Sequence, residues 1–64
     1  MIGYVAKDKD GEIYLHTEKP TYSTKYEAWC SNTEMFDITK GFPEFDNMSY
    51  ADEPIKVEIK LERV

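Results

Sequence analysis

The chain has 64 residues and a net charge of −5, with 13 acidic residues against 8 lysines and arginines. A chain of this length forms one domain with a small core, and its single cysteine and single histidine exclude an internal disulfide and a metal site built from those residues. The acidic balance disfavours direct binding to nucleic acid or to anionic membranes.

The rest of the composition favours a folded protein of the reducing cytoplasm. The hydrophobic fraction is 41% and there are nine aromatic residues, whose large rings supply much of the apolar area that folding requires. The N-terminus shows no signal-peptide pattern, and no run of residues is apolar enough to span a membrane. Cys30 has no second cysteine to pair with, which also favours a reducing compartment. We expect no cofactor and no membrane partner.

Residues 2–17 predict a β-hairpin, because two runs of aromatic and β-branched residues flank the turn sequence at 8–11, Asp-Lys-Asp-Gly. A two-residue loop would pair Ala6 with Leu15. A three-residue loop that ends in a glycine bulge would pair Val5 with Leu15 instead. We favour the bulged form, because Asp-x-x-Gly suits a type I turn followed by a left-handed glycine.

The next segments are weaker in pattern. Residues 18–24 contain a proline and three hydroxyl residues and predict a loop. Residues 25–30 allow two interpretations: Thr24 and Glu27 resemble a helix capping box, but tyrosine, tryptophan and cysteine are poor helix formers. We favour a strand here and leave one or two helical turns as the alternative. Residues 35–38 predict a further short strand.

The C-terminal half ends on the clearest pattern in the chain. Pro43 suits the first position of a single helical turn over 43–49, which would lay rings over the sheet. Pro54 and the two acids before it break any continuation. From Ile55 to Val64 the sequence predicts an amphipathic strand, because apolar and charged residues alternate strictly from 55 to 62. Its apolar face needs cover, which we expect from the ring-rich segment 26–50.

The predicted fold is therefore a β-rich to α+β domain over residues 1–64. It contains one small antiparallel sheet, built from the N-terminal hairpin and the C-terminal amphipathic strand, with a short helical turn or loops as cover. Antiparallel pairing is favoured because the charged positions of the last strand leave one face in water.

The negative charge is concentrated in the middle of the chain. Residues 26–53 hold seven acids against Lys40, a net charge of −6, and six of the nine aromatic residues. Exposed rings are enriched at protein interfaces, and carboxylates steer a basic partner. The residues predicted to form such an interaction surface are Trp29, Tyr26, Phe45, Glu44, Asp46, Asp52 and Glu53.

Sequence patterns for catalysis and metal binding are incomplete. A calcium loop aligned on Gly11 would place Ala6 and Thr17 where carboxylates are required, so a hairpin turn is the better interpretation. Cys30 and His16 could form a nucleophile and base pair, but nothing in the sequence brings them together. Catalysis by paired carboxylates needs a sheltered cleft, which so short a chain has little volume to build. We therefore predict no catalytic residues and no metal ligands.

These observations favour a non-enzymatic binding or accessory protein whose acidic, aromatic middle contacts another, basic protein. The alternative is a small acidic inhibitor that mimics nucleic acid and acts on a DNA-binding host protein. An enzyme is a more distant alternative. An exposed strand edge would also allow two copies to pair as a homodimer.

Several short motifs occur in a recognisable order along most of the chain. They are Asp8-x-Asp10-Gly11-x-Ile13-Tyr14-Leu15, Lys19-Pro20, Trp29, Phe42-Pro43 and Asp52-Glu53-Pro54-x-x-Val57. In this order they resemble small proteins from phages and mobile elements of gut bacteroidetes. The resemblance implies a phage-like origin; no activity is known for such proteins, so it assigns no function to any residue.

Overall fold

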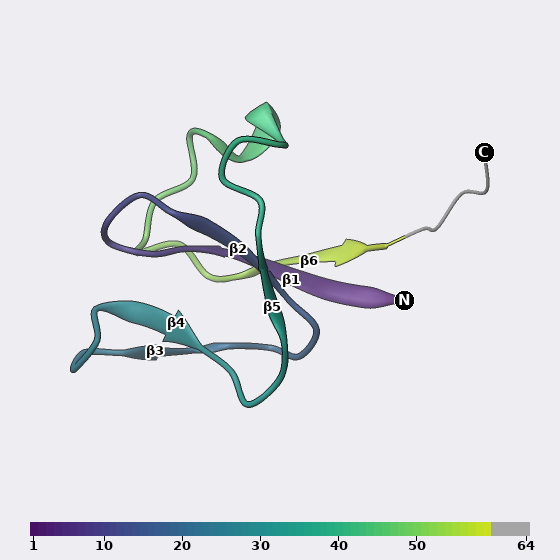
Figure 1. Ribbon diagram of the computed structural model, residues 1–64. Coiled ribbons are helices and arrows are strands. Elements are labelled where there is room, and N and C mark those ends of the chain that lie inside the picture. The colour runs from purple at the N-terminus through teal and green to yellow at the C-terminus, as the bar shows by residue number, and fades with distance from the viewer. Residues whose placement is uncertain (60–64) are drawn as a thin grey trace.

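Two antiparallel sheets form the fold of residues 1–59, which are the residues that the computed structural model describes (Figure 1). The elements in chain order are β1 (Ile2–Lys7), β2 (Ile13–His16), β3 (Thr21–Ser23), β4 (Ala28–Cys30), β5 (Met35–Asp37), the 3-10 turn η1 (Pro43–Phe45) and β6 (Ile55–Glu58). The larger sheet has the strand order β5-β2-β1-β6, and β3 pairs with β4. The prediction of a β-rich antiparallel fold with a short helical turn is confirmed.

The β1–β2 hairpin adopts the bulged register. Val5 lies opposite Leu15. The turn closes through a hydrogen bond of 3.0 Å from the Gly11 amide to the Asp8 carbonyl, and Gly11 has φ of 94°. Glycine adopts this left-handed conformation without steric cost, and no other residue of the turn has positive φ, which is the geometry of the three-residue loop and not of a two-residue type I′ loop.

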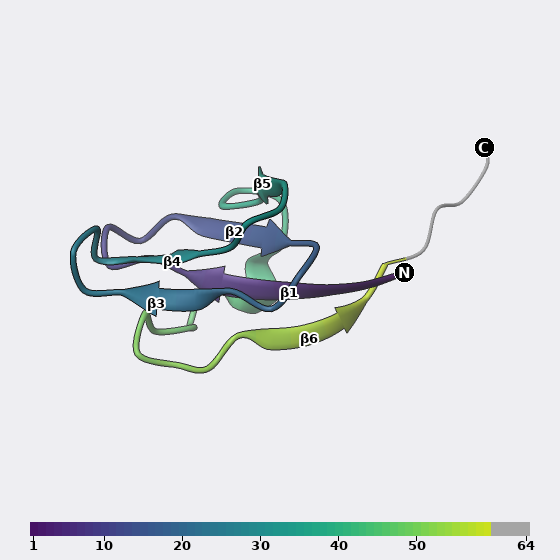
Figure 2. The ribbon, with the colours of Figure 1, turned by 90° about the horizontal axis from the view of Figure 1, so that it is seen from below.

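The four-stranded sheet is the central layer, with different cover on its two faces (Figures 1 and 2). The β3–β4 ribbon lies against one face, which we call the hairpin face; Ala6 and His16 point to it. The segment that contains η1 lies against the other face, which we call the cleft face; Val5, Leu15 and Val57 point to it. The alternation of side chains along each strand produces this division.

The hydrophobic core lies on the cleft face. Its buried members are Val5, Ile13 and Met48, and the half-buried side chains packed against them are Leu15, Ile38, Phe45 and Val57. The ring-rich middle thus contributes Phe45 to the same core that Val57 joins, and direct cover of the last strand by these rings stays a prediction. Trp29 does not join this core, because β4 carries it to the opposite side of the sheet.

Two predictions about local structure need correction or confirmation. The predicted loop over 18–24 is wrong at Thr21–Ser23, which form β3, because Tyr22 lies opposite Trp29 in a paired ribbon that no local pattern indicates. In segment 25–30 the strand prediction is confirmed over Ala28–Cys30 by β4, residues 25–27 belong to the turn before it, and the helical alternative is wrong. The turn before β4 contains Glu27 with φ of 52°, a conformation that ends any helical geometry there.

The last strand is confirmed over Ile55–Glu58. Its apolar side chains are not uniformly buried: Ile55 is 41% exposed, whereas Val57 and Ile59 are half-buried. The predicted continuation of the strand through residues 60–64 lies outside the described residues.

Candidate functional site

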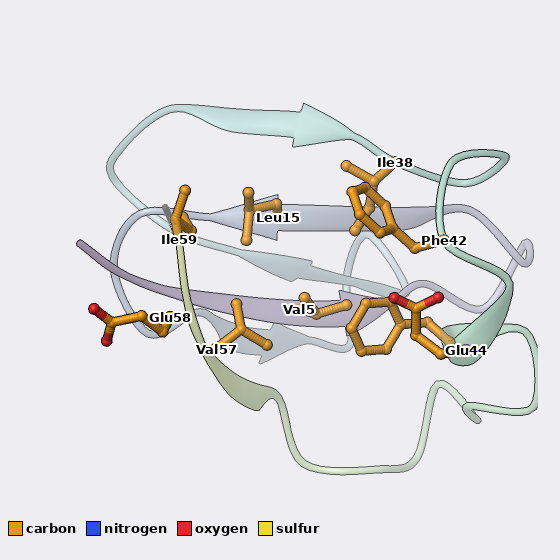
Figure 3. Close-up of a pocket in the computed structure, with 9 residues that line it drawn as sticks. Val5, Leu15, Ile38, Phe42, Glu44, Val57, Glu58 and Ile59 are labelled. Atoms are coloured by element: carbon orange, nitrogen blue, oxygen red, sulfur yellow. The ribbon is translucent and has the colours of Figure 1, made fainter. Parts of the chain in front are cut away.

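An open cleft of about 390 Å³ lies on the cleft face, between η1 and β6 (Figure 3). Its floor is formed by Val5 from β1 and Leu15 from β2, which are cross-strand neighbours. Val57 and Ile59 line the side nearest β6. These positions share one face because the strand register aligns odd-numbered residues of β1, β2 and β6.

Gly3 gives this end of the cleft its depth. A Cβ atom at Gly3 would lie 2.7 Å from Ile59 Cδ1 and 2.9 Å from Leu15 Cδ1. Both distances are shorter than van der Waals contact, so a side chain here would push the two apolar tips into the cleft. The absence of a side chain at this strand position therefore leaves the space that Ile59 and Leu15 border.

The other end of the cleft is built by the segment that follows β5. Ile38, Phe42 and Phe45 line it, and the rings of Phe42 and Phe45 lie 6.3 Å apart at a tilt of 55°. Phe45 is half-buried, but Phe42 is 45% exposed. An exposed phenyl ring at the mouth of an apolar cleft is a surface that another apolar group can cover.

Hydrogen bonds around η1 hold this wall in place. The Asp46 amide donates to the Pro43 carbonyl at 3.1 Å, and Lys7 Nζ donates to the Asp46 carbonyl at 3.0 Å. Pro43 stands at the start of the turn, where its fixed φ suits the helical geometry. The cleft is therefore largely formed before any ligand enters it.

Carboxylates stand at the two ends of the cleft (Figure 3). Glu58 lies at the β6 end, and its Oε1 is 3.9 Å from the N-terminal ammonium of Met1. Glu44 lies at the η1 end and forms no ion pair within residues 1–59. Glu44 is consequently the acid at the cleft that is available to a basic group of a ligand.

The structure places two of the predicted interaction residues at the cleft. Glu44 and Phe45 line it, and Asp46 follows directly in the chain. Asp52 has a structural contact instead, because its Oδ2 accepts a hydrogen bond of 2.8 Å from the Ser49 amide. Glu53 is exposed in the loop before β6.

The two remaining predicted residues lie on the other side of the sheet. Trp29 packs edge-on against Tyr22 with ring centroids 5.4 Å apart, and its Nε1 donates to the Tyr50 carbonyl at 3.0 Å. Tyr26 is 67% exposed in the β3–β4 turn, with Lys25 Nζ 5.3 Å from its ring centroid. The seven predicted residues are therefore divided between two surfaces, and Trp29 joins the two covers of the sheet.

The hairpin face buries a polar cluster that no sequence pattern indicated. Asp8 Oδ1 accepts a hydrogen bond of 2.9 Å from the Trp29 amide, and His16 Nδ1 lies 3.0 Å from Ser31 Oγ. Burial raises the pKa of Asp8 above its ordinary value, and the Trp29 amide partly opposes this shift. Burial lowers the pKa of His16, and the charge of Asp8 partly opposes that shift. His16 is therefore favoured in its neutral form.

Cys30 is not part of this cluster. Its side chain is exposed, and its Sγ lies 3.8 Å from the Ala28 carbonyl. No hydrogen bond joins Cys30 to His16 in the part of the chain that the structure describes. Nδ1 of the buried imidazole contacts the Ser31 hydroxyl and Nε2 is buried without a hydrogen-bond partner in residues 1–59, so neither ring nitrogen is placed as a base for the thiol.

Two further properties bear on the kind of site present. Within residues 1–59, no three histidine, cysteine or acidic side chains are grouped so that they could hold a metal ion. The same residues contain no helix with the length and apolar character needed to cross a membrane.

Sequence reasoning missed the apolar lining of the cleft. Leu15 was placed only in the predicted hairpin, Val57 and Ile59 on the apolar face that needs cover, and Phe42 among the six rings of the middle, none with a place in a site. Two features of the sequence could have indicated the cleft. Phe42 and Phe45 are spaced three residues apart in the predicted turn that contains Pro43, and the strand from Ile55 has more apolar positions than one such turn can cover.

Comparison of the chain with protein-family models, with curated proteins and with solved structures gave no match. The resemblance to phage and mobile-element proteins accordingly stays a prediction.

Proposed function

We propose that this protein is a non-enzymatic binding module that accepts an apolar, basic segment of another protein in the cleft between η1 and β6. The observation that supports this is a preformed cleft of about 390 Å³ whose lining is apolar apart from Glu44 and Glu58. Cavities of roughly 300–1,000 Å³ with few polar groups are typical of binding sites. Covering this apolar surface within the chain would stabilise so small a domain, and leaving it exposed forgoes that stabilisation.

The charge distribution defines the partner. Glu44 stands at the mouth beside Phe42, and the surrounding segment 26–53 carries a net charge of −6. A lysine or arginine flanked by apolar side chains would place its charge at Glu44 and its neighbours on the phenyl rings. Asp52 already serves the turn at Ser49, so fewer carboxylates are free to imitate phosphates. Protein binding is therefore preferred over nucleic-acid mimicry.

A reducing, cytoplasmic location belongs to the same proposal. Cys30 is an exposed free thiol on β4. Exposed thiols without a partner persist in reducing compartments, where disulfide exchange is suppressed.

Selection from a random peptide library displayed on phage tests the function. We expect the immobilised protein to enrich peptides that carry a lysine or arginine next to two or more apolar residues. Binding of the enriched peptides should be lost on Phe42→Ala and on Glu44→Lys. Enrichment of no peptides, or of peptides without this composition, would contradict the proposal.

Two matched controls separate the cleft from the general surface. Tyr26→Ala removes an exposed ring, 67% exposed against 45% for Phe42, from the β3–β4 turn on the other side of the sheet. Glu53→Lys makes the same charge change as Glu44→Lys, but in an exposed loop. Both controls should retain peptide binding. If Tyr26→Ala weakens binding as much as Phe42→Ala, the cleft is not the site.

A further inference from the structure

β6 is an outer strand of the four-stranded sheet, and one of its edges has no partner strand in residues 1–59. Met1 and Ile59 exchange two backbone hydrogen bonds, of 2.7 and 3.3 Å, at the end of the β1–β6 ladder. Hydrogen-bonded and non-bonded pairs alternate along an antiparallel ladder. The amides and carbonyls of Lys56 and Glu58 therefore point to the open edge, away from β1.

Proteins commonly protect such an edge with like charges, prolines or bulges, because it is a template for another strand. The edge of β6 carries a different pattern. Its two outward backbone positions belong to residues of opposite charge, Lys56 and Glu58, and both side chains are exposed. When two copies of this strand pair antiparallel, this pattern allows opposite charges to face each other, so the two strands are not repelled.

We propose that two copies of the chain pair through β6, antiparallel, with the two-fold axis at Val57. In this register Lys56 of each copy lies directly opposite Glu58 of the other. An axis at Lys56 or at Glu58 would place like charges opposite each other, which is destabilising. A shift by one residue would pair side chains from opposite faces of the sheet, which the pleat does not allow. Charge complementarity thus selects one register within the described strand.

The pairing satisfies groups that the single copy leaves in water. Each Lys56 and Glu58 pair exchanges two backbone bonds, so the two symmetric pairs form four, and the two four-stranded sheets become one continuous sheet. On the cleft face, Val57 meets its own counterpart, and Ile55, which is 41% exposed, lies opposite Ile59 of the second copy. The two clefts then open on the same face, on either side of the axis.

The opposite edge of the sheet is a poorer candidate. Pairing of β5 with its copy about Phe36 would place Met35 opposite Asp37, so no pair of opposite charges would form. The Asp37 carboxylate also accepts hydrogen bonds from Thr39, through its amide at 2.9 Å and its hydroxyl at 2.5 Å. β6 is therefore the edge that favours a second copy.

Sedimentation equilibrium over a concentration series, with charge variants of β6, tests the proposal. We expect the natural protein to form dimers, and the variants Lys56→Glu and Glu58→Lys to dimerise at least about tenfold more weakly, because each places like charges opposite each other. An equimolar mixture of the two variants should recover dimers, because the opposite charges face each other again. The double exchange Lys56→Glu with Glu58→Lys should also recover them. A natural protein that stays monomeric, or single variants that dimerise as well as the natural protein, would overturn it.

A backbone variant tests the edge itself. Lys56→Pro removes an amide that points to the open edge and leaves the bonds between β6 and β1 intact. We expect a folded monomer by circular dichroism, whereas the matched variant Lys56→Gln keeps the amide and still dimerises. A folded, dimeric Lys56→Pro variant would exclude this interface. If that variant does not fold, the mixing experiment still decides.

The dimer and the proposed peptide binding can fail separately. Lys56 does not line the cleft, so peptide binding by Lys56→Glu measures the cleft with the dimer removed. Loss of the dimer with peptide binding intact would leave the proposed function standing, and the reverse result would leave the dimer standing.

Discussion

The two faces of the central sheet are covered in opposite ways. On the hairpin face, the β3–β4 ribbon leaves Ala6 and His16 with no exposed surface, 0% for each. On the cleft face, a single 3-10 turn and its flanking loops leave Val57 and Phe45 half-buried. The face with the polar cluster is closed, and the face with the apolar core is partly open. Hydrophobicity alone therefore does not determine which face of a small sheet is sealed.

The difference follows from the directionality of the contacts. Asp8 and the Nδ1 of His16 need partners at fixed positions, which the backbone of β4 and the hydroxyl of Ser31 provide, while His16 Nε2 is buried without a hydrogen-bond partner in residues 1–59. The β3–β4 ribbon can place its hydrogen-bonding groups at those positions only if it lies close to the sheet, and it then excludes water. Apolar contacts have no preferred direction and tolerate a looser cover. The cleft face can consequently remain folded while part of it stays available to a ligand.

The largest expected effect tests whether the partly open face still provides most of the stability. Ile13 is 2% exposed in the core of the cleft face. Ile13→Ala should lower the free energy of unfolding by about 2–5 kcal/mol, measured by urea denaturation with circular dichroism. Phe36→Ala, at an exposed position, should change it by less than about 1 kcal/mol. An equal cost for the two variants would show that the cleft face adds little.

A smaller effect is expected where the two covers meet. The Trp29 indole donates to the Tyr50 carbonyl, which joins the β3–β4 ribbon to the loop before β6. Trp29→Phe keeps a ring against Tyr22 but removes this bond, and should cost about 0.5–1.5 kcal/mol in the same denaturation experiment. Faster hydrogen exchange should follow in residues 49–54. Unchanged exchange there would show that the two covers are independent.

The closed face should also make stability depend on pH. Because burial lowers the pKa of His16, the unfolded chain binds a proton near the ordinary value of 6.5 before the folded chain does. The free energy of unfolding should therefore fall as the pH drops through about 6.5 toward the lower pKa of the folded state. Burial raises the pKa of Asp8, which acts in the opposite direction, with stability lost as the pH rises through its folded pKa.

His16→Gln isolates the histidine contribution, because the amide can still bond to Ser31 but does not titrate. Asp8 remains in both proteins, but its charge interacts with that of His16, so the comparison measures the histidine contribution together with its coupling to Asp8. Urea midpoints across the pH range should show a shallower decline on acidification for the variant. An identical decline in both proteins would mean that His16 does not cause it.

The smallest effect concerns a titration and leaves stability almost unchanged. The Tyr14 hydroxyl donates to Glu12 Oε2 at 2.5 Å, and this bond to a carboxylate raises the pKa of Tyr14 to about 12. Glu12→Gln should return that pKa toward the ordinary 10.0, seen as phenolate absorbance in alkaline titration. The Tyr14→Phe variant identifies the signal. A late-titrating tyrosine that survives in Tyr14→Phe would contradict the assignment.

Much of the sheet could be predicted from local pattern. The hairpin register was favoured by the Asp8-x-x-Gly11 spacing, which suits a type I turn followed by a left-handed glycine, and in this turn only Gly11 has positive φ. The last strand followed from alternation at residues 55–59, and the helical turn followed from Pro43. In each case the cause lies within a few residues of the effect.

The β3 strand and the composition of the site could not be predicted in this way. Thr21–Ser23 form a strand because β4 pairs with them. Trp29 and Phe45 both lie in one aromatic segment, yet the chain crosses from one face of the sheet to the other between them. Their division depends on the path of the chain, which no local pattern encodes.

The sequence by itself determined the antiparallel, β-rich fold and the concentration of negative charge and favoured the register of the hairpin, since turns and alternation act over short distances. Only the tertiary structure decided which face is closed, that a cleft lies between η1 and β6, and that Glu44 stands at its mouth. The physical reason is that burial depends on which distant segment covers each face, and two segments with equally aromatic sequences cover opposite faces here.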